Sequence, residues 1–241
     1  MCGRFAQSRL VADLVEEFGI TGTSPESPLP ANWNIAPTVD IYIVRQDRDN
    51  SRSLASASWG IIAPWQKTFD AARTSQSHAI NARSESVHEK PTFRDAFRKR
   101  RCLIPADGYY EWATALGEYP PKQPFYICAR DGSQLPIAGI WSSWRASDGE
   151  LIESASIITQ EAQGSLSKIH SRMPVFMPHD RWDEWLNPEN KEIEKLRALM
   201  HIDAPDALVI ARPVSSAVNS VARNSHELTA EIDLGEPETL F

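Results

Sequence analysis

Residues 102–112 read CLIPADGYYEW, and this stretch shows how the chain is built. Two short apolar and aromatic runs, 102–104 and 108–112, lie on either side of a segment that contains an Asp-Gly pair, which is typical of a turn. Similar strand-like runs recur on both sides of it, at 41–44, 54–62, 124–129, 136–144, 156–159, 173–177 and 208–214. Many short strands separated by turns predict a curved antiparallel sheet or a barrel-like core.

Amphipathic stretches between these runs predict short helices at 8–18, 92–100, 163–169, 180–186 and 191–200. In the first of them the apolar residues recur at helical spacing, and Ser8 has the side chain of an N-cap. Strands with helices at intervals predict an α+β fold, with a single domain over residues 1–226. Residues 227–241 carry five acidic side chains and no Lys or Arg, which predicts a mobile, solvated tail.

The composition excludes several classes of protein. The 241 residues are 41% hydrophobic and 24% charged, which is ordinary for a globular chain. Lys and Arg number 25 against 32 Asp and Glu, a net charge of −7, which argues against a protein that coats nucleic acid but leaves room for one basic groove. With no long apolar run and no signal peptide, we expect a cytoplasmic protein that does not enter the membrane.

The cysteine pattern gives no reason to expect a metal or another cofactor. Cys2, Cys102 and Cys128 are far apart, and the sequence contains no Cys-x-x-Cys pair. A cysteine-based zinc site is therefore not expected, and neither is a disulfide.

Cys2 is the most informative residue of the chain. If Met1 is removed, the chain begins with a free α-amine beside a thiol, and both groups are nucleophiles near neutral pH. The amine can form a Schiff base with an aldehyde, and the thiol can then close a five-membered thiazolidine. Two alternatives stay open: a terminus without a function, or an N-terminal-nucleophile hydrolase that uses the terminal amine as a base.

Four further polar segments are candidates for the same site. In the segment 80–86, Asn81 can orient a terminal amine and Arg83 can bind a phosphate, although a turn Asn and a surface Arg are the commoner explanation. Glu111 lies between aromatic neighbours, where loss of water suits a carboxylate to moving protons; a solvated Glu on a strand is the alternative. His170 is a natural acid or base at a helix-to-strand junction, or else a surface His. Trp65 follows a proline in a loop and offers a platform on which a base can stack.

Taken together, five motifs resemble one family, the SOS-response-associated peptidase (SRAP) family. They are MCGRF at 1–5, WNIAP at 33–37, INARSE at 80–85, CLIPADGYYEW at 102–112 and IHSRMP at 169–174. Each motif alone is weak, but five in one order are specific, and they cover nearly the whole chain.

The resemblance implies a sensor of abasic sites in single-stranded DNA that needs no cofactor. Cys2 matches the residue that captures the sugar aldehyde as a thiazolidine crosslink, and Asn81 matches the residue that orients the reacting terminus. Glu111 matches the acid/base carboxylate, and His170 matches the histidine that assists sugar opening and crosslink reversal. The residues that match DNA contacts, or lie along the expected DNA path, are Arg4, Asn34, Pro37, Trp65, Arg83, Thr159 and Arg172. A thiol autopeptidase and a non-covalent single-strand binder are the alternative functions.

Overall fold

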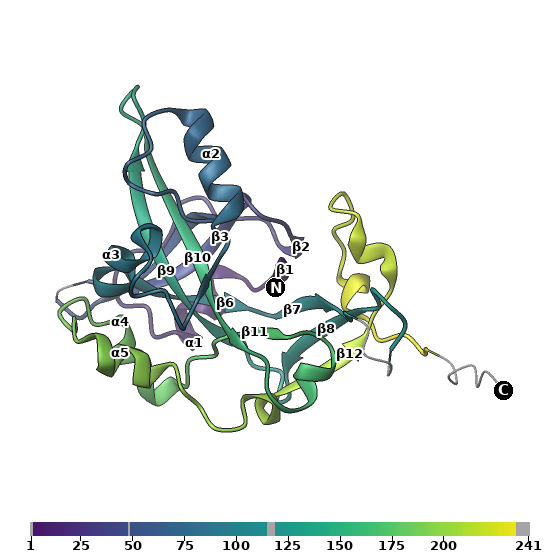
Figure 1. Cartoon of the computed structure of the whole chain (residues 1–241). Helices are drawn as coiled ribbons and strands as arrows, with labels where there is room; N and C mark the ends of the chain where they lie inside the picture. The colour runs from purple at the N-terminus through teal and green to yellow at the C-terminus, as the bar shows by residue number, and fades with distance from the viewer. Residues whose placement is uncertain (1, 48, 115–118, 235–241) are drawn as a thin grey trace.

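Five strands close into a ring that forms the main body of the molecule (Figure 1). The computed structural model describes residues 2–47, 49–114 and 119–234. Strand β10 pairs with β4, the ring continues through β3 and β6 to β9, and β9 pairs back with β10. The strands are β3 (Asp40–Gln46), β4 (Arg52–Trp59), β6 (Arg101–Ala106), β9 (Leu135–Arg145) and β10 (Leu151–Glu161). This arrangement confirms the expected α+β fold with a barrel-like core.

A second sheet of five antiparallel strands packs against the barrel (Figure 1). In spatial order its strands are β12 (Val209–Pro213), β8 (Pro124–Ala129), β7 (Gly108–Trp112), β1 (Arg4–Gln7) and β2 (Asn32–Ile35). The break between β6 and β7 lies at the Asp-Gly pair of the opening motif, so this turn carries the chain from the barrel into the second sheet.

Alternate residues of the barrel strands face two different apolar clusters, as the two-residue period of a strand requires. Ile41 and Ile43 join a cluster that also contains residues of the second sheet. Tyr42 and Val44 join a cluster that packs against the helices. The contributing helices are α1 (Val11–Glu17), α3 (Pro91–Lys99), α4 (Trp182–Leu186) and α5 (Ile193–Leu199).

Two short strands extend the barrel where the site lies. β5 (Asn81–Arg83) runs parallel to β10 beyond the end of β4, and β11 (Arg172–Pro174) runs antiparallel to β10 on its other edge. The β4–β10 and β5–β10 pairings are parallel, which differs from the all-antiparallel sheet that the sequence predicts. Both pairings join segments far apart in the chain, so no hairpin signal announces them.

Three local expectations need correction. α2 (Phe69–His78) is absent from the predicted helices, because it buries only Ala72 and Gln76 and so lacks an apolar stripe. α1 begins at Val11 and not at Ser8; its N-cap is Leu10, which is 71% exposed. The Ser8 backbone N–H instead donates to Asp107, so Ser8 joins two sheet segments and caps nothing.

The remaining elements are short 3-10 turns, and no helix in the described ranges is long and apolar enough to cross a membrane. The turns are η1 (Gly164–Lys168), η2 (His179–Arg181), η3 (Pro205–Leu208), η4 (Ser216–Asn219) and η5 (His226–Thr229). The predicted start of the acidic tail falls within η5, where Leu228 is buried. Contacts with the rest of the protein continue to Ile232, whose backbone N–H donates a hydrogen bond to the carbonyl of Pro213. Residues 235–241 lie outside the described part.

Candidate functional site

Cys2 lies just ahead of β1 and has no exposed surface. Its side chain belongs to the apolar cluster that contains Phe5, Trp59 and Ile157. Burial, and secondly the negative charge of Glu111, raise the pKa of the Cys2 thiol well above its usual value. The thiol is therefore protonated at neutral pH, and it needs a base before it can act as a nucleophile.

Asn81 is the first residue of β5 and fixes the backbone at Cys2. Its Nδ2 donates a 2.8 Å hydrogen bond to the carbonyl oxygen of Cys2. The Oδ1 of the same amide is buried and accepts no hydrogen bond from the residues that the structure describes. Asn81 thus binds Cys2 with one end of its amide and leaves a hydrogen-bond acceptor in the site.

Glu111 and His170 form the polar side of the site. Glu111, on β7, is 5% exposed, and its Oε2 lies 4.0 Å from Nδ1 of His170. The backbone N–H of Arg172 donates a 2.9 Å hydrogen bond to the same Nδ1. A neutral His170 therefore carries its proton on Nε2, and Nε2 is the ring nitrogen that can donate to a bound molecule.

The four residues predicted to be catalytic thus lie together, although they come from four separate parts of the chain. Asn81 touches Cys2, the charge of Glu111 acts on the Cys2 thiol, and His170 lies against Glu111. A thiol, an amide, a carboxylate and an imidazole that lie together can support covalent chemistry.

Arg83 and Arg172 lie on the strands that flank β10 at the site. Arg83 is exposed at the end of β5 and pairs in register with Thr159 of β10. Arg172 forms a bidentate pair with Glu85, at 2.5 and 3.0 Å, and donates to the Thr159 carbonyl at 2.7 Å. The hydrogen bond from Arg172 lowers the pKa of Glu85. Thr159 is fully buried, so any effect on a ligand would pass through Arg172.

Arg4, Asn34 and Pro37 lie around β1 and β2. Arg4 donates to the Asn34 side-chain oxygen at 2.7 Å and to a backbone carbonyl at residue 218. Asn34 is 3% exposed, and its amide nitrogen donates to three carbonyl oxygens in the segment 218–223. In this arrangement Asn34 and Arg4 tie the C-terminal segment to the second sheet. Pro37, partly buried, lies two residues after the end of β2.

Trp65 lies in the loop between β4 and α2 and is 51% exposed. Phe69, the first residue of α2, is 46% exposed, and the Arg73 guanidinium lies 5.2 Å from its ring centroid. Phe69 and Glu85 were not among the predicted site residues. Phe69 follows Trp65 by four residues, and this spacing was the one feature of the sequence that could have pointed to Phe69. Nothing in the sequence indicates that Glu85 pairs with Arg172.

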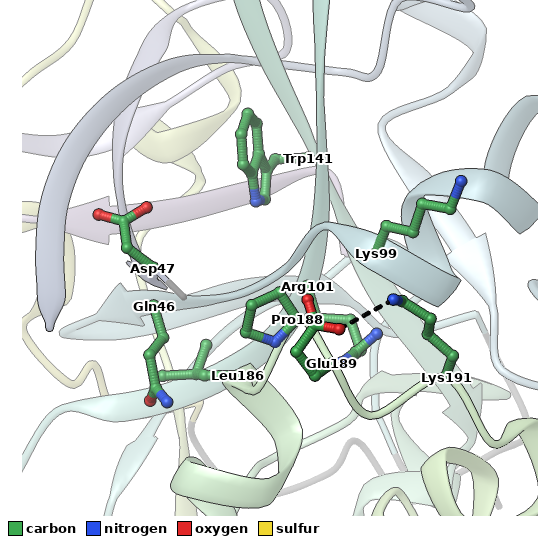
Figure 2. Close-up of a pocket in the computed structure, with 9 residues that line it drawn as sticks. All are labelled: Gln46, Asp47, Lys99, Arg101, Trp141, Leu186, Pro188, Glu189 and Lys191. Atoms are coloured by element: carbon green, nitrogen blue, oxygen red, sulfur yellow. Dashed lines mark hydrogen bonds and ion pairs between the residues drawn. The ribbon is translucent and has the colours of Figure 1, made fainter. Parts of the chain in front are cut away.

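A separate pocket of about 360 Å³ contains none of the predicted site residues (Figure 2). Arg101 lies beneath it, is 2% exposed, and donates hydrogen bonds to four backbone carbonyls. With its guanidinium used in this way, Arg101 joins the end of α3 to the segment that follows α4. The lining residues are Gln46, Asp47, Lys99, Arg101, Trp141, Leu186, Pro188, Glu189 and Lys191.

The other two cysteines lie away from this chemistry. Cys102 is buried on β6, where burial raises the pKa of its thiol, and Cys128 is partly buried on β8. Within residues 2–47, 49–114 and 119–234, no three His, Cys, Asp or Glu side chains are grouped so as to hold a metal ion.

Comparison with known proteins gives matches over nearly the full length. The chain is 36% identical over 229 residues to abasic site processing protein YoaM of Bacillus subtilis, a match that covers 95% of this chain and 97% of that protein. It is 32% identical over 216 residues to abasic site processing protein HMCES of mouse, covering 78% of this chain and 60% of the mouse protein.

Solved structures share the fold. A protein from Bacteroides thetaiotaomicron superposes with a TM-score of 0.82 at 24% identity, over 96% of this chain and all of that one. A protein from Bordetella bronchiseptica gives a TM-score of 0.73 at 27% identity, over 89% of this chain and all of that one. The family described as SOS response associated peptidase (SRAP) matches residues 1–221, and the chain therefore belongs to the SRAP family.

Proposed function

We propose that this protein captures abasic sites in single-stranded DNA by forming a thiazolidine crosslink through Cys2, after Met1 has been removed. The observation that carries the proposal is the meeting of Cys2 with Asn81, Glu111 and His170 in one buried site. The names of the relatives, abasic site processing proteins, supply the substrate class.

The first chemical step is Schiff base formation. The α-amine of Cys2 adds to the aldehyde of the ring-opened sugar, and water leaves as the carbon–nitrogen double bond forms. Asn81 already binds the Cys2 carbonyl, and its Oδ1 is available to accept a hydrogen bond from the amine. This contact directs the amine lone pair towards the aldehyde and away from the protein.

The second step closes the ring. Glu111 takes the thiol proton, the sulfur attacks the protonated imine carbon, and the electron pair of the double bond moves to nitrogen. Burial makes the Cys2 thiol a weak acid, so the base must stand close to it, as Glu111 does. Reversal runs the same steps backwards, with Glu111 returning the proton to sulfur.

His170 assists the opening of the sugar ring. Because Nδ1 accepts from the backbone of Arg172, the neutral ring can donate only from Nε2. When the sugar opens, the bond between C1 and the ring oxygen breaks, the ring oxygen gains a proton and the C1 hydroxyl loses one as the aldehyde forms. A hydrogen bond from Nε2–H to the ring oxygen would stabilise the charge that develops there, and so would favour the aldehyde that the amine attacks.

Arg83 and Arg172 would hold phosphates on either side of the abasic site, and Trp65 would stack on a neighbouring base. Only a few phosphates need to be neutralised, because the covalent bond keeps the DNA in place. This is how a chain with a net charge of −7 can use DNA as its substrate.

Intact mass spectrometry tests the proposal. The Met1-free protein is mixed with a single strand that holds one abasic site, and with the same strand holding an ordinary nucleotide. We expect a heat-stable adduct only with the abasic strand, with a mass equal to protein plus DNA minus one water. A protein that retains Met1 and still forms this adduct would contradict the mechanism, because its Cys2 nitrogen is an amide.

Two other functions use some of the same residues. A thiol peptidase or N-terminal-nucleophile amidohydrolase would consume a peptide or glutamine substrate, and abasic DNA would leave its mass unchanged. A non-covalent single-strand binder would bind equally well after Cys2 has been alkylated. The same preparation can be given each substrate in turn, which separates these functions from crosslinking.

A further inference from the structure

Tyr109 lies on the same face of β7 as Glu111, two residues away along the strand. It pairs in register with Phe5 of β1, the strand that follows Cys2, whereas Tyr110 pairs with Arg4. Successive side chains of a strand point to opposite faces. Tyr109 and Glu111 therefore face the cluster that contains Cys2, and Tyr110 faces the other side of the sheet, in a cluster with Ala6 and Tyr126.

The Tyr109 hydroxyl is a donor on the Cys2 side of the sheet. The residue is 1% exposed, and its ring packs against Phe176 at a centroid distance of 6.4 Å. Among the residues that the structure describes, none forms a hydrogen bond with this hydroxyl, although Tyr110 and Trp59 each have a partner for their polar atom. With no partner among the described residues to hold it, this hydroxyl can donate to a group that forms on the Cys2 side during the reaction.

The hydroxyl also keeps its proton. Burial, then the charges of Cys2 and Glu111, raise the pKa of Tyr109 well above its usual value. Those two groups are thus its electrostatic neighbours. At neutral pH Tyr109 offers them an O–H donor and no charge.

We propose that Tyr109 is a further catalytic residue, whose hydroxyl donates a hydrogen bond to the sulfur of Cys2 while that sulfur is a thiolate. This inference rests on the proposed function and assigns a hydrogen-bond donor to the sulfur in addition to Glu111 and His170. The charged Glu111 disfavours ionisation of the thiol beside it, and once it has taken the thiol proton it is neutral, so Tyr109 supplies a second O–H donor to the thiolate. A neutral donor stabilises the thiolate and adds no charge to the site.

The step balances as follows. In ring closure the thiol proton passes to Glu111, the sulfur lone pair forms the new C–S bond, and the π electrons of the protonated imine become the lone pair of the ring nitrogen. The Tyr109 proton stays on its oxygen throughout. In ring opening the C–S electrons return to sulfur, and the same O–H stabilises the leaving thiolate before Glu111 reprotonates it.

The substitution Tyr109→Phe tests this directly, because it removes the hydroxyl and keeps the ring. Tyr110→Phe is the matched control: it removes the neighbouring hydroxyl on the other face, which donates to the Trp33 carbonyl at 2.7 Å. Tyr109→Phe is expected to leave the melting temperature unchanged or slightly higher, because the lost hydroxyl has no protein partner to leave unpaired.

Two rates are measured on each Met1-free protein. The first is crosslink formation and its reversal into excess competing abasic DNA, which we expect Tyr109→Phe to slow about tenfold or more, the usual effect of losing a hydrogen bond to a charged group. The second is alkylation of Cys2 by iodoacetamide between pH 7 and 10, followed on the N-terminal peptide so that Cys102 and Cys128 do not contribute. At each pH the alkylation rate should be lower in Tyr109→Phe, because less thiolate is present, and unchanged in Tyr110→Phe.

The outcomes separate the two proposals. If the wild type forms no heat-stable adduct, the proposed function is wrong, while the alkylation profile still decides whether Tyr109 stabilises the thiolate. If the wild type crosslinks and Tyr109→Phe matches it in both rates, the role of Tyr109 is wrong. Equal losses in both Phe variants would also overturn it, because the effect would then come from packing of the sheet.

Discussion

Cys2 supplies both nucleophiles of the proposed reaction, and their separate contributions can be measured. Cys2→Ala keeps the α-amine and loses the thiol, so it should still form a Schiff base that borohydride traps, but no heat-stable adduct. Cys2→Ser should behave alike, since its hydroxyl closes a much less stable ring. The readout is the fraction of abasic DNA retained on a denaturing gel, with and without borohydride. A heat-stable adduct at the wild-type level in either variant would exclude the thiazolidine.

Glu111 and His170 are expected to matter more for reversal than for formation. A free aminothiol reacts with aldehydes unaided, whereas a closed thiazolidine needs a positioned proton to open. A positioned acid or base typically contributes about 10²–10⁴-fold in rate. We therefore expect Glu111→Gln and His170→Ala to slow transfer of the crosslinked protein to competing abasic DNA by about tenfold or more at pH 7. Wild-type transfer rates in both variants would remove these two residues from the mechanism.

At the scale of the elements, β5 and β11 bring two arginines to the C-terminal end of β10, and of the two only Arg172 has an ion-pair partner among the described residues. Arg83 is exposed, while Arg172 is held by Glu85 in a bidentate pair. A phosphate that reaches Arg172 must therefore compete with the Glu85 carboxylate.

This competition predicts opposite effects of two substitutions. Arg83→Ala should weaken binding to single strands of any sequence and lower the salt dependence by about one phosphate contact. Glu85→Gln should tighten binding, because it frees Arg172 and removes a negative charge near the phosphates. Fluorescence anisotropy with an ordinary single strand, over a range of salt concentrations, measures both. Lys191→Ala, next to the separate pocket, is the control; an equal loss in Lys191→Ala and Arg83→Ala would mean that no local groove exists.

At the scale of the whole molecule, the core encloses several acids that are neutral when protonated. Burial raises the pKa of the Cys102 thiol and of the Tyr109 and Tyr126 hydroxyls above their usual values. The folded protein thus holds these protons more tightly than the unfolded chain. Their contribution to stability is complete below the unfolded pKa values, about 8.5 for Cys and about 10 for Tyr, and is lost as the pH rises above them.

The protein should consequently lose stability on the alkaline side. Each such group costs up to about 1.4 kcal/mol for every pH unit above its unfolded pKa. Urea unfolding at pH 7.5, 9 and 10.5, under reducing conditions, should show a falling free energy of unfolding. Tyr126→Phe should flatten the last part of that fall, since it removes one of the titrating hydroxyls. A free energy that stays constant from pH 7.5 to 10.5 would contradict this account.

The sequence by itself determined much of the local structure and singled out the candidate reactive residues. The apolar and aromatic runs and the Asp-Gly turn located β6 and β7, because both signals act over a few residues. The unusual chemistry of an N-terminal aminothiol singled out Cys2, and the motifs around Asn81, Glu111 and His170 pointed to the same reaction.

Only the tertiary structure decided how these parts meet. Closure of the barrel, the parallel pairing of β5 with β10, and the Glu85–Arg172 pair each join segments far apart in the chain. Which faces pack together also decides that Cys2 is completely buried and that Tyr109 lies in the same cluster as Cys2. The physical reason is that periodicity shows which face of a segment is apolar, whereas the partner of that face, and the distance between two charges, are set by packing of the whole chain.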